Sequence, residues 1–127
     1  MEADLMGNDP MRDVLDRWKT AFDGHDLDVM ASLFTPDALF QGFGPTVIAG
    51  RDAIRDYYDA VPDDRSADVT ILHTYRIGEQ TAGGFADVIF SDHAGWEASV
   101  HLSLVLQQDN GVWSIRQYHV SQWMTEH

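Results

Sequence analysis

The chain has 127 residues, a length that fits one domain built around a single hydrophobic core. Its 21 acidic and 8 basic residues give a formal net charge of −13. This charge argues against nucleic acid and anionic membranes as partners, because both are bound by clustered Lys and Arg. The absence of cysteine excludes disulfides, thiol nucleophiles and thiolate metal sites.

The ends of the chain and its compartment follow from composition. No apolar run approaches the length of a membrane span, and the polar first residues are unlike a signal peptide. We therefore expect a cytoplasmic protein. Residues 1–8 are predicted to be a flexible leader, and residues 9–123 are predicted to form one domain.

The first predicted helix begins at Asp9, a favourable N-cap, followed by Pro10 at the first helical position. The apolar residues after it recur with a helical period, which predicts one buried stripe: Val14, Leu15, Trp18, Ala21 and Phe22. Gly24 is expected to end this helix in the left-handed conformation.

A second, short helix is predicted after Asp26, with Val29, Met30, Leu33 and Phe34 on its apolar face and Pro36 at its end. Residues Ala38–Gln41 are expected to form a first strand, and Gly42–Gly50 a loop. A third helix is predicted over Arg51–Val61, because its apolar residues again follow a helical period.

The second half of the chain is rich in β-branched and aromatic residues, which predict strands over Asp68–Ile77, Phe85–Asp92, Ala98–Gln107 and Val112–Gln122. The turn signals between them are too short to hold crossover helices, so neighbouring strands should form antiparallel hairpins. Helices followed by a meander of strands indicate an α+β protein with its helices on one face of the sheet.

Three fragments in this order carry a resemblance to a known family. They are W-x-x-A-F-x-x-H-D-L-D-x-x-A-S-L-F-x-P-D-A-x-F from Trp18, G-R-D-A-I-R-D-Y-Y from Gly50, and G-V-W-S-I-R-Q-Y-H-V-S from Gly111. Together they resemble the SnoaL-like branch of the nuclear transport factor 2-like superfamily over about residues 10–123. Within it, small accessory proteins of enediyne and polyketide biosynthesis are the most similar group.

The resemblance implies a cone-shaped α+β barrel with three N-terminal helices packed on a curved, mostly antiparallel sheet. It also implies a hollow that binds small, mostly apolar molecules, and often a homodimer. Because members of the family differ in chemistry, and some have none, the function must be argued from the site.

Ketosteroid isomerase is the enzyme of this fold that allows the sharpest comparison. It uses a carboxylate base and an oxyanion hole formed by a tyrosine and a protonated aspartic acid. The resemblance puts Trp18 at the donor tyrosine, Gly42 at the base and Ser103 at the second donor. Only a supporting tyrosine is retained, as Tyr58. The resemblance therefore implies a pocket that does not isomerise by that mechanism.

The last predicted strand contains both a tyrosine and a histidine of interest. Simple alternation puts Trp113, Ile115, Gln117, His119 and Ser121 on one face, and Arg116, Tyr118 and Val120 on the other. A β-bulge would exchange the faces partway, so either Tyr118 or His119 faces the cone. His119 is a candidate general acid or base, and the alternative is a structural histidine held by hydrogen bonds.

Orientation is also open for the preceding strand. His101 and Ser103 lie on one face, whereas the opposite face is aliphatic: Val100, Leu102, Leu104 and Leu106. The aliphatic face would either form the core or serve dimerisation on the convex side. Because the resemblance directs Ser103 toward the pocket, we expect the face of His101 and Ser103 to line it.

Four aromatic residues complete the predicted pocket. Of Tyr57 and Tyr58, one is expected in the core and the other to offer a pocket hydroxyl. Trp18 and Phe40 are expected to be core aromatics that also wall the cavity. The six histidines show no spacing typical of a metal site, and residues 42–47 fail the dinucleotide fingerprint, so neither a metal nor another cofactor is expected.

The first hypothesis is a pocket protein of secondary metabolism that binds an apolar small molecule and assists cyclisation, isomerisation or proton transfer on a polyketide-like intermediate. Its predicted catalytic residues are His119, His101 and Tyr58, and its predicted ligand-binding residues are Trp18, Phe40, Ser103 and Tyr118. The alternative is a non-catalytic ligand- or carrier-binding dimerisation module. A third reading is a stress-related isomerase-like protein.

Overall fold

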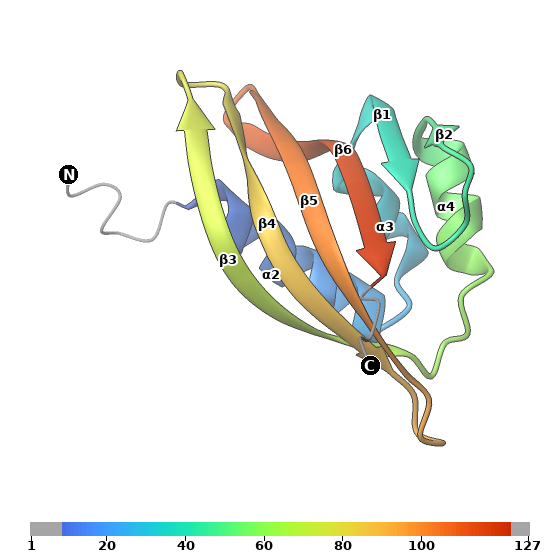
Figure 1. Cartoon of the computed structure of the whole chain (residues 1–127). Helices are drawn as coiled ribbons and strands as arrows, with labels where there is room; N and C mark the ends of the chain where they lie inside the picture. Colours follow the sequence, from blue (N-terminus) through green and yellow to red (C-terminus); the bar gives the residue numbers. More distant parts are fainter. Residues whose placement is uncertain (1–8, 123–127) are drawn as a thin grey trace.

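The computed structural model describes residues 9–122 of the chain. It contains three helices, α2 (Pro10–Asp23), α3 (Leu27–Ser32) and α4 (Arg51–Asp59). Its six strands are β1 (Phe34–Gln41), β2 (Ile48–Ala49), β3 (Ser66–Ile77), β4 (Thr81–Ser91), β5 (Glu97–Asp109) and β6 (Val112–Gln122). None of the described helices is long and apolar enough to cross a lipid bilayer. Figure 1 shows the long strands β3 to β6 curving across the helices, which lie on one face of the sheet.

The sheet has the strand order β2-β1-β6-β5-β4-β3, and only the β1–β6 pair is parallel. The predicted α+β architecture, with three helices on a curved and mostly antiparallel sheet, is confirmed. The sheet does not close into a barrel, however, because β2 and β3 remain as its two edges. The fold is therefore an open cone whose hollow lies between the helices and the inner face of the sheet.

Helix α2 begins as predicted but ends differently. The Asp9 side chain accepts a hydrogen bond from the Met11 N–H at 3.0 Å, as an N-cap does. Gly24 follows the helix with φ −89°, and the left-handed residue is His25, with φ 52°. The prediction of a left-handed Gly24 is wrong by one position.

The second helix is shorter than predicted because the residues expected in its last turn pair with β6 instead. Helix α3 ends at Ser32, and Phe34 already pairs with Ile115 of β6. The Ile115 N–H donates to the Leu33 carbonyl at 2.7 Å. Pro36, predicted to stop a helix, instead lies inside β1 where its register with β6 shifts, as expected for a residue without an N–H.

The later elements lie close to their predicted positions. Helix α4 ends at Asp59, two residues before the predicted end, and β6 has the predicted bounds. The two-residue strand β2 lies within the segment that was predicted to be a loop. It pairs with β1 through Ala49 and Ile48, which brings the start of α4 beside the sheet.

A β-bulge in β6 decides which side chains enter the cone. Val105 of β5 pairs with Gln117, but the next residue, Leu106, pairs with Ile115, so Arg116 is an extra residue. Because side chains alternate along a strand, one extra residue exchanges the two faces. The buried residues of β6 on the inner face are therefore Ile115, Tyr118 and Val120.

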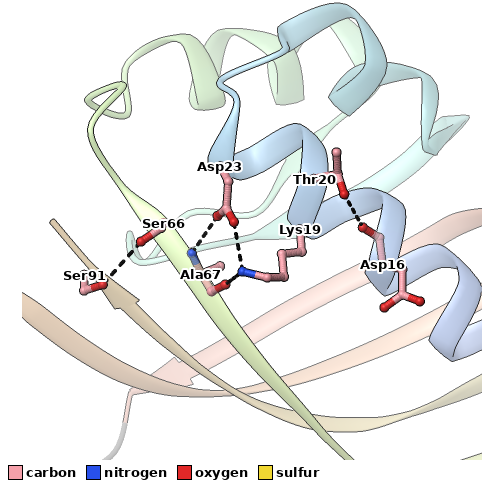
Figure 2. A network of polar contacts seen from close by, with 7 residues as sticks. All are labelled: Asp16, Lys19, Thr20, Asp23, Ser66, Ala67 and Ser91. Carbon is pink, nitrogen blue, oxygen red and sulfur yellow. Dashed lines mark hydrogen bonds and ion pairs between the residues drawn. The ribbon is translucent and has the colours of Figure 1, made fainter.

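The end of α2 holds the start of the edge strand β3 through Lys19, Asp23 and Ala67, here called the α2–β3 clamp (Figure 2). Asp23 accepts a hydrogen bond from the Ala67 N–H at 2.9 Å, and Lys19 donates to the Ala67 carbonyl and pairs with Asp23. Edge strands carry unpaired backbone groups, and the clamp satisfies both groups of Ala67. Since Arg65 lies two residues before Ala67, the clamp also fixes the backbone beside the cone's opening.

Candidate functional site

Helices α2 and α4 and the inner face of the sheet enclose a cavity of about 70 Å³. Its buried lining residues are Phe22, Gly42, Tyr58, Phe90, Tyr118 and Val120. The residues around its opening are Phe43, Tyr57, Val61, Arg65 and Trp96. An apolar wall with a few hydroxyl groups and one guanidinium is typical of a site for a small molecule.

Three side chains form a chain of hydrogen-bond donors in the floor of the cavity. The indole N–H of Trp18 donates to the Tyr58 hydroxyl at 3.1 Å. Since an indole N–H can only donate, the Tyr58 proton is left for the neighbouring Tyr118 hydroxyl, with which Tyr58 also interacts. The Tyr118 proton is then the last of the series, and Tyr118 lines the cavity.

Both floor tyrosines are protonated at neutral pH. Burial raises the pKa of Tyr58 well above its usual value; the neighbouring Tyr118 raises it further, and the hydrogen bond from Trp18 opposes the rise. Burial also raises the pKa of Tyr118, and its hydrogen bond with Tyr58 opposes that rise. These phenols therefore act as hydrogen-bond donors and not as bases.

Phe40 supports this floor from behind. Its ring stacks on Tyr118 with centroids 4.3 Å apart and an interplanar angle of 10°, and it meets Tyr58 edge-on at 5.5 Å. Phe40 and Trp18 are almost fully buried, and neither is among the residues that line the cavity. The two residues predicted as ligand walls thus lie one layer behind the wall and hold its tyrosines in place.

Tyr57 fills the space beside Gly42, the residue that the comparison with ketosteroid isomerase puts at the position of the general base. Its hydroxyl accepts a hydrogen bond from the Phe43 N–H at 3.0 Å. A Cβ added at Gly42 would lie 2.2 Å from this hydroxyl oxygen, so any side chain at residue 42 would displace Tyr57. The space that a carboxylate side chain at residue 42 would need is therefore filled by the phenol of Tyr57.

Arg65 and Trp96 meet at the opening of the cavity. The Arg65 guanidinium carbon lies 3.8 Å from the centroid of the Trp96 ring, close enough for a cation–π interaction. The turn that carries Trp96 is fixed by Asp92, whose carboxylate accepts from the N–H groups of Ala94 at 2.8 Å and Trp96 at 2.9 Å. The Trp96 hydrogen bond is the main cause of the lowered pKa of Asp92, and the positive charge of Arg65 also contributes.

Three predicted site residues lie on the outer face of the sheet, away from this cavity. The buried face of β5 is the aliphatic one, so the expected inward orientation of His101 and Ser103 is wrong. His119 pairs with Ser103 across the strands and is exposed beside it, because the bulge at Arg116 turns Tyr118 inward instead. His101 lies 2.7 Å from the Asp87 carboxylate through its Nδ1. The catalytic roles predicted for His119 and His101 gain no support from these positions.

Sequence reasoning missed the residues at the opening, above all Arg65 and Trp96. They are far apart in sequence, and each lies outside the segments that show a helical or strand period. The one available signal was a tryptophan directly after the turn signal His93–Gly95, where polar residues are usual.

The chemistry that this site can perform follows from its lining. None of the described residues that line the cavity is a carboxylate or a histidine. Within residues 9–122, no three His, Cys, Asp or Glu side chains are grouped so that they could hold a metal ion. The cavity offers apolar contact, hydrogen-bond donation from phenols and one positive charge.

Comparisons with known proteins agree with this architecture. A family model described as SnoaL-like domain matches residues 11–125. A comparison with curated proteins finds no sequence match.

Several solved structures share the fold. Rv3472 from Mycobacterium tuberculosis, in variant form, superposes with a TM-score of 0.81 at 21% identity, over 98% of this chain and 76% of that one. A protein with a cystatin-like fold from Caulobacter vibrioides gives 0.80 at 19% identity, over 94% and 91%. A ketosteroid isomerase-like protein from Erwinia carotovora atroseptica gives 0.77 at 18% identity, over 90% and 94%. At these identities the likeness shows the fold alone.

Proposed function

The chain belongs to the SnoaL-like domain family, and from the cavity that its cone holds we propose that it binds a small, largely apolar molecule with an aromatic part. The observation that carries this proposal is the cavity itself, with aromatic walls and the protonated hydroxyls of Tyr58 and Tyr118 at its floor. Its volume of about 70 Å³ is smaller than the roughly 150 Å³ of a cavity that binds benzene, so we propose a ligand whose ring enters only in part and projects through the opening.

The ligand class implied by the family resemblance is a polyketide-like intermediate of secondary metabolism. Such molecules carry carbonyl or hydroxyl oxygens on an apolar ring system. Tyr118, as the last donor of the series from Trp18, would donate to such an oxygen, and Tyr58 would act as a positioning residue. Ligand binding is the primary proposal, whether the protein only holds its ligand or also delivers it to another protein.

A catalytic contribution is compatible with the same geometry. Hydrogen-bond donation to a carbonyl oxygen stabilises the negative charge that develops there when the molecule enolises or cyclises. Proton transfer would also need a base, and the described lining residues offer none. We therefore propose assistance by hydrogen-bond donation, with the base supplied by the substrate or by solvent.

The proposal is tested with 2-acetylnaphthalene, a neutral aromatic ketone, as a probe in isothermal titration calorimetry. The wild-type protein is expected to bind it, and Val61→Trp at the opening should abolish binding by filling the entrance. Tyr118→Phe should weaken binding roughly 2- to 10-fold, the effect of one lost hydrogen bond.

The matched controls are His119→Ala and Ser103→Ala on the outer face, which should leave the dissociation constant unchanged. Unaltered binding by Val61→Trp would show that the ligand does not use this cavity. Native mass spectrometry of the purified protein offers a second measurement, because a retained ligand would add its mass to the chain.

The proposal also includes a homodimer in the cytoplasm, as the sequence and the family resemblance predict. The outer face of the sheet exposes large apolar side chains that a second copy would cover: Tyr75, Ile77, Phe85 and Ile89. Contiguous apolar surface of this kind is characteristic of protein–protein contacts.

A further inference from the structure

We infer that Arg65 is an anion-binding residue at the opening of the cavity, and that the ligand is an aromatic acid: an apolar ring partly inside the cone with a carboxylate at its mouth. This inference rests on the proposed function, because it names the ligand class of the same cavity. It adds a charged group to a site whose remaining lining offers only apolar contact and neutral hydroxyls.

Arg65 belongs to the half of the basic side chains that form no ion pair with a described residue. Four basic side chains form ion pairs within 4.0 Å, namely Arg17–Asp13, Lys19–Asp23, Arg55–Asp28 and Arg116–Asp37. Arg65 forms none with a residue in the range 9–122, and neither do Arg12, Arg51 and Arg76. Arg65 differs from those three in its place, because it lines the cavity and its guanidinium lies against the Trp96 ring.

The hydrogen bonds of Arg65 are also incomplete. Its Nε is buried, and no described group accepts a hydrogen bond from it. A buried donor without a partner is uncommon in folded proteins, and a bound ion or water is one of its explanations. A carboxylate matches the fork of guanidinium N–H groups with two parallel hydrogen bonds, and a small rotation of the side chain would present Nε and one terminal nitrogen together.

The surroundings hold Arg65 in position on both sides. Asp92 orders the turn that carries Trp96, and the α2–β3 clamp fixes the strand that begins directly after Arg65. A guanidinium held by a ring and by a fixed backbone loses little freedom when it binds an anion, which is the condition for a specific contact.

The charges around the site favour a ligand with one negative charge over a ligand with two. Arg65 is the only basic residue among the described residues that line the cavity, and Asp92 lies near enough for Arg65 to lower its pKa. One guanidinium can compensate one carboxylate. A phosphate dianion would retain an excess negative charge beside Asp92, in a protein whose net charge is −13.

The test compares 2-naphthoate with 2-naphthamide, which have the same ring and nearly the same shape but differ in charge. Calorimetry at neutral pH and low salt on the full chain should show naphthoate binding roughly 10- to 100-fold more tightly to the wild-type protein, as expected for a hydrogen-bonded ion pair. Arg65→Met should remove this preference and leave the affinity for naphthamide within about 3-fold. Arg65→Lys should restore part of it.

Arg76→Met is the matched control, because Arg76 also lies over a tryptophan, Trp113, at 5.1 Å, but neither residue lines the cavity. This variant should keep the preference for naphthoate. Equal affinity of the wild-type protein for the two compounds would overturn the anion site and leave the apolar pocket standing, as would an unchanged preference in Arg65→Met. Failure of the wild-type protein to bind either compound would overturn both proposals.

Discussion

Tyr118 is the residue that we propose as hydrogen-bond donor to a ligand in the cavity. It is buried, it stacks on Phe40, and it lies beside Tyr58, whose hydroxyl accepts a hydrogen bond from the indole of Trp18. The stacking on Phe40 holds the Tyr118 ring at the cavity before any ligand binds. Such preorganisation is what makes a single donor effective on a developing negative charge.

The raised pKa values of Tyr58 and Tyr118 predict a loss of stability in alkali. Unfolded tyrosine ionises near pH 10.0, so above this pH the folded state binds more protons than the unfolded state. The stabilising contribution is therefore complete below about pH 10 and is lost as the pH rises further. Ultraviolet titration of tyrosinate should show two of the four tyrosines ionising only together with unfolding.

Tyr118→Phe is the informative variant for this titration. It should remove one late-ionising group and make the alkaline loss of stability less steep. Reversible ionisation of all tyrosines while circular dichroism still reports the native fold would contradict the assignment.

At the scale of elements, the α2–β3 clamp joins the first helix to an edge strand through side chains alone. Asp23 and Lys19 act as a substitute for a neighbouring strand at Ala67. The same contact discourages another chain from pairing there, because the exposed backbone groups are already satisfied.

Replacing Asp23 by Ala should lower the free energy of unfolding by about 1–2 kcal/mol, since the Ala67 N–H loses its acceptor and Lys19 loses its ion pair. Asp13→Ala is the matched control, because it removes the exposed Asp13–Arg17 pair of the same helix and should cost less than about 0.5 kcal/mol. Urea denaturation measures both. Equal midpoints for Asp23→Ala and the wild-type protein would show that the clamp contributes nothing.

The order and type of the elements follow from local sequence patterns, and the sequence predicted them well. The exceptions have physical causes. Leu33 and Phe34 continue the apolar period of the second helix, yet they serve β1, because pairing with Ile115 satisfies backbone groups that a further helical turn would have used. The hydrophobic period of a short segment cannot reveal this competition between helix and strand, because the partner strand β6 lies near the other end of the chain.

On the scale of the whole molecule, the sheet separates two surfaces of different composition. The inner face, with the helices, encloses the cavity, whereas the outer face bears exposed apolar residues and none of the helices of residues 9–122. An open sheet of this kind can bind a small molecule on one side and another protein on the other.

Ile89→Lys and Phe85→Lys should prevent dimerisation if the outer face is the interface, because each buries a charge between the two copies. Analytical ultracentrifugation should give the mass of two chains for the wild-type protein and of one chain for these variants. Val112→Lys is the control, since Val112 is 56% exposed but lies at the β5–β6 turn. A wild-type mass of one chain at every concentration would contradict the dimer.

The sequence by itself determined the class of this fold, most of its helices and strands, and an aromatic core that includes Trp18 and Phe40. These features follow from hydrophobic periodicity and turn residues, which act over a few positions. The tertiary structure decided which groups face the cavity. One extra residue, Arg116, turns Tyr118 inward and His119 outward, and two distant turns bring Arg65 onto Trp96. Both outcomes depend on strand register and on contacts between remote segments, and a period of two residues makes facing sensitive to a shift of one.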